Sequence, residues 1–423
     1  MAKILILCGV ASLCAANGPL ILAQTPSKKI EATGRADPRL IAFDRTMKTF
    51  LREHDLPGAQ LAVARRGRLI LIRGYGYADV AAKELVHPDA LFRIASISKP
   101  ISAVAVLQLV ERGKLKLDAP IFDVLDLQQP KEGEGRFDPR WKKITIRQLL
   151  QHRGGWDRDR SFDPMFRSPK IVRELHVEPP ARPNDIVRYM LRMPLDFDPG
   201  TKDAYSNFGY CLLGRVVEKA SGQTYESYVR KEVLAPLGIR SMRLGETLPE
   251  GRARGEVKYH VPESEMGRAI MGAHLGELVP SPYGAWCLES MDAHGGWLAS
   301  AADLVRFVTA FDDPAHCKIL KAKSIALMLA RPPGAAGSKP NGKPRDAYYA
   351  CGWMVRPVGD GGGCNIWHSG SLPGTSTLLV RRHDGLAWAV LFNSRHSSKK
   401  KEPAAAIDPL MHEAADAVTS WPR

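Results

Sequence analysis

The sequence predicts an α+β fold in which one antiparallel sheet is built from strands near both ends of the chain. An early apolar stretch at 58–74 is typical of a β-hairpin. The last third holds four further runs that favour strands, at 352–356, 365–370, 375–381 and 386–392. Apolar residues between these regions recur mainly at helical spacing. Strands at both ends with helices between them favour a single sheet assembled from both termini.

The composition is that of a globular protein larger than one ordinary core. The chain has 423 residues, of which 44% are hydrophobic and 25% charged. This length predicts two lobes, or one domain with a large insertion. The formal net charge is +15, but Lys and Arg are scattered and no basic helix or aromatic-basic strand appears. We therefore expect no nucleic-acid partner; attraction to an anionic cell envelope, or solubility, explains the charge.

The first residues predict a secretory signal peptide over 1–23. Lys3 precedes a short apolar run at 4–16, and cleavage after Ala23 or near Ala16 would release the mature chain. The run is shorter than the roughly 20 residues that a spanning helix needs. We expect a secreted or periplasmic protein without a transmembrane span; an uncleaved N-terminal tether is the alternative.

The cysteines do not predict a metal site. Five remain after the expected signal peptide, without the spacing of metal ligands. One disulfide could form in an oxidising compartment, but no pairing follows from the sequence. The five are Cys211, Cys287, Cys317, Cys351 and Cys364.

The remaining elements follow from periodicity and turn residues. The hairpin should turn at Arg66-Gly67, and a last hairpin turn is expected at 382–385. Thr145 is the expected N-cap of a short helix that ends before Gly155. Longer loops are expected at 157–183 and 332–346, and 246–290 is irregular. Further helices are expected at 37–55, 101–113, 208–222, 301–311 and 404–418.

A candidate nucleophile and base stand where the buried helix at 101–113 begins. In Ser96-Ile-Ser-Lys99 the two residues are three apart, so the Lys99 amine can reach the Ser96 hydroxyl on one helix face. The pattern alone is weak, since Ser397 with Lys400 also matches it in a charged surface run. Taken alone, Ser96 could equally be a helix N-cap beside a surface Lys.

Two more polar clusters accompany it. Tyr205-Ser-Asn207 lies on a turn at the start of the helix at 208–222, where a rigid element presents side chains well. The alternative is that both residues only close the turn and cap the helix. His368-Ser-Gly370 lies in a strand near the end of the chain. His152, at a helix end, is interpreted as structural because no partner acid, base or ligand is spaced with it.

Together, Ser96-Ile-Ser-Lys99, Tyr205-Ser-Asn207 and His368-Ser-Gly370 resemble the serine β-lactamase and penicillin-binding-protein superfamily. The likeness covers roughly residues 38 to 415 and is greatest to its class C branch, with its D-alanyl-D-alanine carboxypeptidases, D-aminopeptidases and esterases. It implies a sheet domain beside a helical domain, with the site between them. We assign 38–115 and 291–420 to the sheet domain and 116–290 to a helical domain with long loops.

The resemblance also implies a role for each residue. Ser96 would be the nucleophile, Lys99 the base and Tyr205 the group that moves the proton to the leaving group. Backbone N–H groups of Ser96 and Ser371 would form the oxyanion hole. The remaining substrate-binding positions would be Asn207, His368, Ser369 and Gly370.

His368 departs from the Lys that many relatives carry there on the edge strand. A neutral His offers a carboxylate only a hydrogen bond, so efficient β-lactamase activity is in doubt. We therefore expect a cofactor-free serine hydrolase that cleaves an ester or an amide, for example in a small molecule or a cell-wall peptide. The alternative is a sensor or receptor that β-lactams acylate without release.

Overall fold

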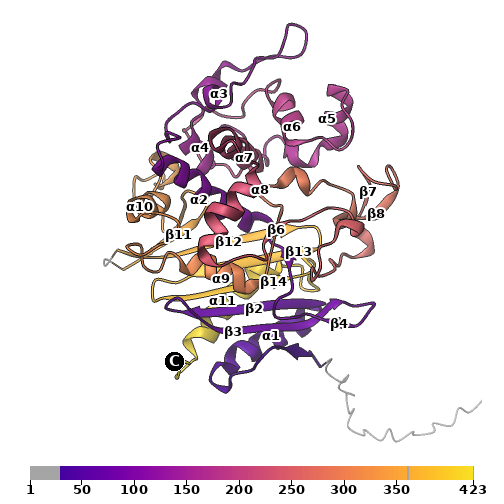
Figure 1. Ribbon diagram of the computed structural model, residues 1–423, viewed down its shortest axis with the longest axis vertical. Helices are drawn as coiled ribbons and strands as arrows, with labels where there is room; N and C mark the ends of the chain where they lie inside the picture. The colour runs from indigo at the N-terminus through magenta and orange to yellow at the C-terminus, as the bar shows by residue number, and fades with distance from the viewer. Residues whose placement is uncertain (1–28, 360–361, 423) are drawn as a thin grey trace, which may run out of the picture.

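A nine-stranded antiparallel sheet, with strands of different lengths, forms the centre of the protein (Figure 1). The computed structural model describes residues 29–359 and 362–422. The strand order is β1-β3-β2-β14-β13-β12-β11-β10, with β4 paired to β3. The predicted α+β class and the pairing of early with late strands are therefore confirmed. The strands are β1 (Ala32–Thr33), β2 (Gly58–Arg65), β3 (Arg68–Asp79), β4 (Glu84–Leu85), β10 (Tyr348–Tyr349), β11 (Met354–Val358), β12 (Gly363–Leu372), β13 (Thr375–Arg381) and β14 (Leu386–Phe392).

The two ends of the chain meet at the pair β2 and β14. Leu386 lies opposite Arg65, and the antiparallel register continues to Phe392 opposite Ala59. The β2–β3 hairpin turns at Arg66 and Gly67, both with positive φ, which is the geometry a two-residue turn needs. The predicted turn is confirmed.

Each face of the sheet is covered by helices, so the central strands are buried on both sides. In β14, Trp388, Val390 and Phe392 point into a core shared with the helices α1 (Ile41–His54) and α11 (Pro403–Asp416). We call this the back core. The alternate residues of β14 join a larger front core with α2 (Ser98–Glu111) and α9 (Ala301–Thr309). Figure 1 shows α1 below β3, and α2 and α7 (Asn207–Ser221) above the sheet.

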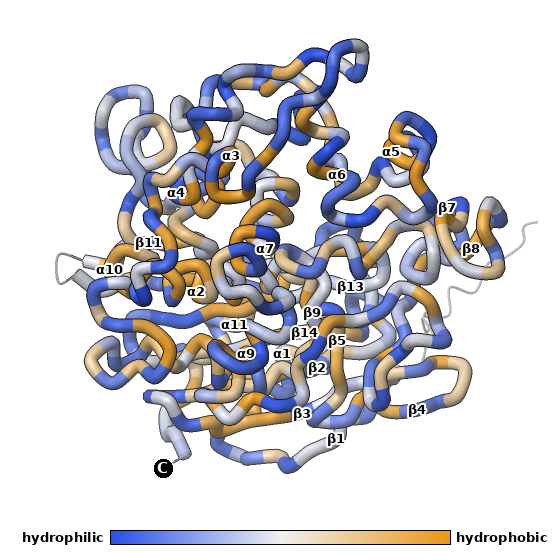
Figure 2. Tube along the Cα trace, turned by 45° about the horizontal axis from the view of Figure 1, so that its top comes forward, coloured by the Kyte–Doolittle hydropathy of each residue, from blue (hydrophilic) through white to orange (hydrophobic). Residues whose placement is uncertain are grey.

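The chain between α2 and α9 carries most of the remaining helices. It lies above the sheet in Figure 1, and Figure 2 shows hydrophilic stretches along its outer loops. Helix α7 packs on α2 and α4, which ties this region to the front core. The predicted boundaries at 115 and 290 stay a prediction. The helices and strands of this segment are α3 (Ile121–Val124), α4 (Ile146–Leu150), α5 (Ser168–Leu175), α6 (Pro183–Met190), α7 (Asn207–Ser221), α8 (Tyr225–Tyr228), β6 (Arg243–Leu244), β7 (Met266–Arg268), β8 (Leu278–Pro280) and β9 (Trp297–Ala299). Outside it, β5 (Phe92–Arg93) precedes α2, and α10 (Ala322–Leu329) follows α9.

The resemblance places His368 on an edge strand, but the strand that carries it, β12, is not at the edge of the sheet over its whole length. β12 lies between β13 and β11, but its pairing with β11 ends at Trp367 opposite Met354. From His368 to Leu372 it pairs only with β13. The expectation of an edge therefore holds locally, because this half of β12 has no strand on its other side among the described residues.

The segment 1–23, expected to be a signal peptide, lies outside the described residues. Within the described part of the chain, none of the helices has the length and apolar character needed to span a membrane.

Candidate active site

Ser96 lies in a tight turn between β5 and α2 that neighbouring strands hold in place. Ala95, directly before it, adopts a left-handed φ of 48°, which costs free energy for a residue with a Cβ. Two hydroxyls of β13 stabilise the turn: Thr375 donates to the carbonyl of Arg93, and Thr377 to that of Ile94, both at 2.9 Å. Ser96 remains partly exposed, while the residues on either side of it are buried.

The Lys99 side chain is fully buried directly beside Ser96. Its Nζ lies 3.0 Å from Ser96 Oγ, 2.8 Å from Asn207 Oδ1 and 3.1 Å from the carbonyl of His294. Burial lowers the pKa of Lys99 well below its ordinary value; Asp163 opposes this shift and Arg158 adds to it. Two of the three partners can only accept hydrogen bonds. When Lys99 is neutral, its two N–H groups satisfy those acceptors and its lone pair faces Ser96.

The polar turn before α7 brings Tyr205 and Asn207 to the same place. Ser206 caps the helix, since its Oγ accepts from the backbone N–H of Gly209 at 3.1 Å. Asn207 is the first helical residue, and its side chain is free of any capping role and contacts Lys99 instead. The alternative interpretation of Asn207 as a cap is therefore wrong.

Tyr205 lies between the nucleophile and two cations. Its phenol shares a hydrogen bond with Ser96. Lys99 Nζ and Arg158 Cζ each lie 4.7 Å from the centre of its ring. Burial raises the pKa of Tyr205, while the contact with Ser96 and the charge of Arg158 oppose that shift. The phenol is thus positioned to pass a proton to or from the Ser96 oxygen.

His368 is buried close to these groups, and this burial keeps it neutral. Its Nδ1 lies 2.6 Å from the carbonyl of Ser369, which can only accept, so Nδ1 carries the proton. Nε2, 3.1 Å from the hydroxyl of Tyr349, then accepts. Burial lowers the pKa of His368 to about 3, and Lys99 acts in the same direction. His368 therefore offers no positive charge at neutral pH.

The residues that follow His368 are alternately exposed and buried along β12. Gly370 is buried, and a Cβ there would lie 2.3 Å from the carbonyl of Ile94, so this glycine permits close approach of β12 to the Ser96 turn. Ser369 and Ser371 are exposed. Ser371 and Ser96 line one cavity of about 420 Å³. Asn207, Arg158, Phe166, Met291, His294, Gly295, Leu372, Pro373 and Arg395 complete its lining.

The sequence alone did not identify four residues of this site. Tyr349, in the two-residue strand β10, contacts His368. Asp163 Oδ2 accepts from Asn207 Nδ2 at 2.6 Å. The carbonyl of His294 accepts from Lys99, and Arg158 packs on Tyr205. None of them falls in a motif or an amphipathic pattern, although His294 directly precedes the glycine pair at 295–296.

His152, interpreted as structural, lies behind the site. It is buried, its Nδ1 accepts from the backbone N–H of Ser206 at 3.2 Å, and its ring lies 4.3 Å from those of Tyr205 and Tyr349. Burial lowers the pKa of His152 well below its ordinary value. Its hydrogen bond to Ser206 and its ring contact with Tyr205 stabilise the turn that carries Tyr205.

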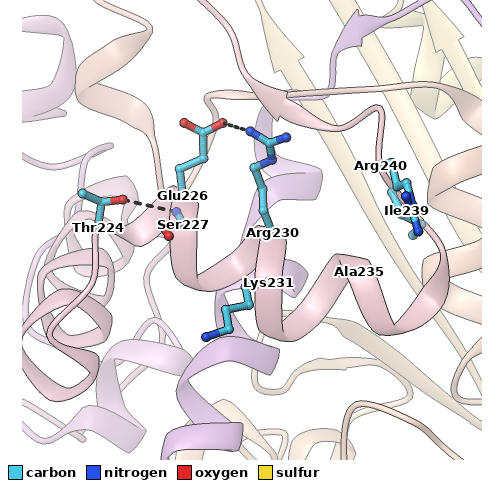
Figure 3. Close-up of a pocket in the computed structure, with 8 residues that line it drawn as sticks. All are labelled: Thr224, Glu226, Ser227, Arg230, Lys231, Ala235, Ile239 and Arg240. Atoms are coloured by element: carbon cyan, nitrogen blue, oxygen red, sulfur yellow. Dashed lines mark hydrogen bonds and ion pairs between the residues drawn. The ribbon is translucent and has the colours of Figure 1, made fainter.

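Other features of the described residues do not suggest a second chemistry. The five cysteines that the structure describes are free, and no group of three or more His, Cys, Asp or Glu side chains there could hold a metal ion. A separate open hollow lies along α8 and the turns after it (Figure 3). It is lined by Thr224, Glu226, Ser227, Arg230, Lys231, Ala235, Ile239 and Arg240, which include none of the predicted site residues.

Comparison with known proteins gives the same family as the motifs. Residues 43–410 match the Beta-lactamase family. Esterase EstB of Burkholderia gladioli is 36% identical over 249 residues, which cover 57% of this chain and 59% of the esterase. Penicillin-binding protein 4 of Amycolatopsis lactamdurans is 30% identical over 71% of this chain and 70% of that protein.

Among solved structures, the D-amino acid amidase of Ochrobactrum anthropi complexed with L-phenylalanine amide has a TM-score of 0.67. The match covers 90% of this chain and 99% of the amidase, at 22% identity. At this identity the likeness concerns the fold alone. With the family match over most of its length, and with the three polar clusters gathered around one hydroxyl, the chain belongs to the beta-lactamase family.

Proposed function

We propose that this protein is a serine hydrolase that cleaves an ester or an amide through an acyl-enzyme on Ser96. One observation carries the proposal: a fully buried Lys99 amine lies 3.0 Å from a partly exposed serine hydroxyl, and its other two partners are acceptors. A serine is a weak nucleophile until a neighbour takes its proton. A module that only binds ligands needs no such base.

The first half of the reaction follows from this geometry. Lys99 takes the hydroxyl proton as Ser96 Oγ forms a bond to the substrate carbonyl carbon. The backbone N–H groups of Ser96 and Ser371 stabilise the oxyanion, and each such donor contributes about 3 to 4 kcal/mol in comparable sites. Tyr205 passes the proton from Lys99 to the leaving alcohol or amine as the bond from the carbonyl carbon to the leaving group breaks.

Hydrolysis of the acyl-enzyme reverses the roles. Tyr205, with Lys99, takes a proton from a water molecule, whose oxygen bonds to the acyl carbon. The ester bond to Ser96 Oγ then breaks, and the serine oxygen recovers a proton. The products are the acid and the free enzyme.

We expect an esterase or a D-alanyl peptidase or aminopeptidase more than an efficient β-lactamase. The neutral His368 supports this, because it supplies no permanent charge for a substrate carboxylate. A cavity of about 420 Å³ suits a small molecule or the end of a peptide, including a cell-wall peptide. The signal-like N-terminus favours a secreted or periplasmic location.

The test combines three substrates with one variant. Wild-type protein is mixed with p-nitrophenyl butyrate, a chromogenic cephalosporin and a D-Ala-D-Ala peptide. We expect turnover of at least one substrate, and an acyl or phosphonyl adduct visible by intact-mass spectrometry that disappears in Ser96→Ala. One stoichiometric burst without turnover would indicate the sensor instead. An undiminished adduct in Ser96→Ala would exclude this serine.

A further inference from the structure

The loop excursion at 157–183 sends one carboxylate to the site, and this carboxylate has no part in the mechanism above. Asp163 Oδ2 accepts from Asn207 Nδ2 at 2.6 Å, and Asn207 Oδ1 accepts from Lys99 Nζ at 2.8 Å. The three side chains form a continuous chain of hydrogen bonds from the loop to the proposed base. The other oxygen of Asp163 is also held, because Oδ1 accepts from the backbone N–H of Met165 at 3.1 Å.

This chain fixes the orientation of the Asn207 amide. An asparagine side chain can present either its oxygen or its NH₂ to a neighbour. A carboxylate can only accept, so Asp163 requires the NH₂ on its side and directs the oxygen toward Lys99. If the amide rotated by half a turn, its NH₂ would face Lys99 and its oxygen would face the carboxylate. Both contacts would then be unfavourable.

The orientation of Asn207 in turn decides what the Lys99 amine can do. With Asn207 Oδ1 and the His294 carbonyl both accepting, the only place left for the lone pair of a neutral Lys99 is toward Ser96. If an NH₂ group took the place of that oxygen, it would compete with the Ser96 hydroxyl to donate to the lone pair. The hydroxyl proton would then lose its acceptor.

From this chain of contacts, we infer that Asp163 is a positioning residue for the reaction at Ser96: it locks the Asn207 amide so that Lys99 faces Ser96 as a base. This inference rests on the proposed hydrolase function. Asp163 is not itself among the residues that line the cavity, and its hydrogen bonds reach Lys99 only through Asn207.

The charge of Asp163 adds an effect that can be measured. Burial lowers the pKa of Lys99, and the Asp163 carboxylate raises it in part. The base must be neutral, so kcat/KM falls as the pH drops through the pKa of Lys99. Removal of the carboxylate removes the raising effect, and the acid limb of the profile should therefore move to lower pH. The other titratable or charged side chains that face Lys99 are Arg158, His152, Tyr205, Tyr210, His294 and His368.

The experiment measures kcat/KM against pH for wild type, Asp163→Asn, Asp163→Ala and Glu178→Ala, with the substrate found for the wild type. Glu178→Ala is the matched control, since Glu178 is an exposed carboxylate on the same excursion that takes no part in the hydrogen-bond chain from Asp163 to Lys99. Asp163→Asn preserves the size of the side chain if Asp163→Ala fails to fold, and circular dichroism checks both.

We expect a 10- to 100-fold lower kcat/KM at pH 7 for Asp163→Ala and no more than a twofold change for Glu178→Ala. Asp163→Asn should retain more activity, with its acid limb at lower pH than in the wild type. A kcat/KM for Asp163→Ala within twofold of wild type would overturn the inference, as would an unmoved acid limb in Asp163→Asn. Wild-type protein without Ser96-dependent hydrolysis would instead overturn the proposed function, so the two failures are distinguishable.

Discussion

At the scale of single residues, His368 is where the chemistry departs most from a carboxylate-binding site. Both of its ring nitrogens are engaged within the protein, with Ser369 and Tyr349, and its low pKa keeps it uncharged. Its role is thus to fix the Tyr349 hydroxyl beside Tyr205, whose ring centre lies 6.3 Å from that of Tyr349. A substrate carboxylate gains no ion pair from it.

We therefore predict that His368→Ala lowers kcat/KM about equally for neutral and carboxylate substrates. The expected loss is about 10-fold for each, which corresponds to about 1.4 kcal/mol of transition-state stabilisation. The measurement compares p-nitrophenyl butyrate with the mono-p-nitrophenyl ester of glutaric acid, which bears a carboxylate on its acyl chain. His383→Ala, at an exposed histidine in the turn between β13 and β14, serves as the control. A loss confined to the glutarate ester would show that His368 binds the carboxylate.

The predicted site residues were within reach of sequence reasoning because each lies in a short motif next to a periodic element. Ser96 and Lys99 lie at the start of a buried helix, and Tyr205 and Asn207 lie at the start of another. Asp163 and Tyr349 could not be found in this way. Asp163 lies in a charged, Pro-rich excursion, and its partner Asn207 is 44 positions away. Only tertiary folding brings such pairs together, and no local pattern records the contact.

At the scale of elements, the close approach of β12 to the Ser96 turn depends on the absence of a side chain at Gly370. A Cβ there would lie 2.3 Å from the Ile94 carbonyl and 2.4 Å from Thr377 Oγ1. The first of these is backbone and the second already donates to that same carbonyl, so neither can move away freely. The glycine of the motif thus has a packing role, and the substrate-binding role that the resemblance implies stays a prediction.

We predict that Gly370→Ala displaces the turn and disables the site. The expected cost is about 1 to 3 kcal/mol of unfolding free energy, as for other overpacked positions, with at least a 10-fold loss of kcat/KM. Urea denaturation and ester hydrolysis measure the two effects. Ser369→Ala, one residue earlier on the exposed face, should change the stability by less than about 0.5 kcal/mol. Wild-type activity and stability in Gly370→Ala would show that the strand can shift without cost.

Elements with clear end signals were predicted most accurately. β13 and β14 match their predicted ranges, because turn residues bound both strands. The place of β12 at the edge of the sheet was right only for its second half, since strand order depends on pairing between distant segments. β11 pairs with the first half of β12, and β10, which pairs with β11, is too short to show a sequence pattern.

At the scale of the whole molecule, the sheet separates two hydrophobic cores, and only one of them contains the helices that carry site residues. The back core, between the sheet and helices α1 and α11, contains none of the predicted site residues. The front core holds α2 and α7, which carry Lys99 and Asn207. Residues alternate between the cores along β14, so a change in the back core reaches the site only through the sheet.

This separation predicts that stability and activity respond independently to changes in the two cores. Ile407, fully buried in α11, belongs to the back core, and Ile407→Ala should cost about 2 to 5 kcal/mol of unfolding free energy. Its kcat/KM at 25 °C should remain within twofold of wild type, because the Ser96 turn and α2 are held by other contacts.

Ile101→Ala is the matched change in the front core, two residues after Lys99 in α2. It should cause a similar destabilisation and also lower kcat/KM at least fivefold, because a cavity beneath the first turn of α2 lets Lys99 shift away from Ser96. Denaturant unfolding gives the stabilities, and initial rates are measured where both variants are folded. An equal loss of kcat/KM in the two variants would mean that the sheet transmits packing changes from one core to the other.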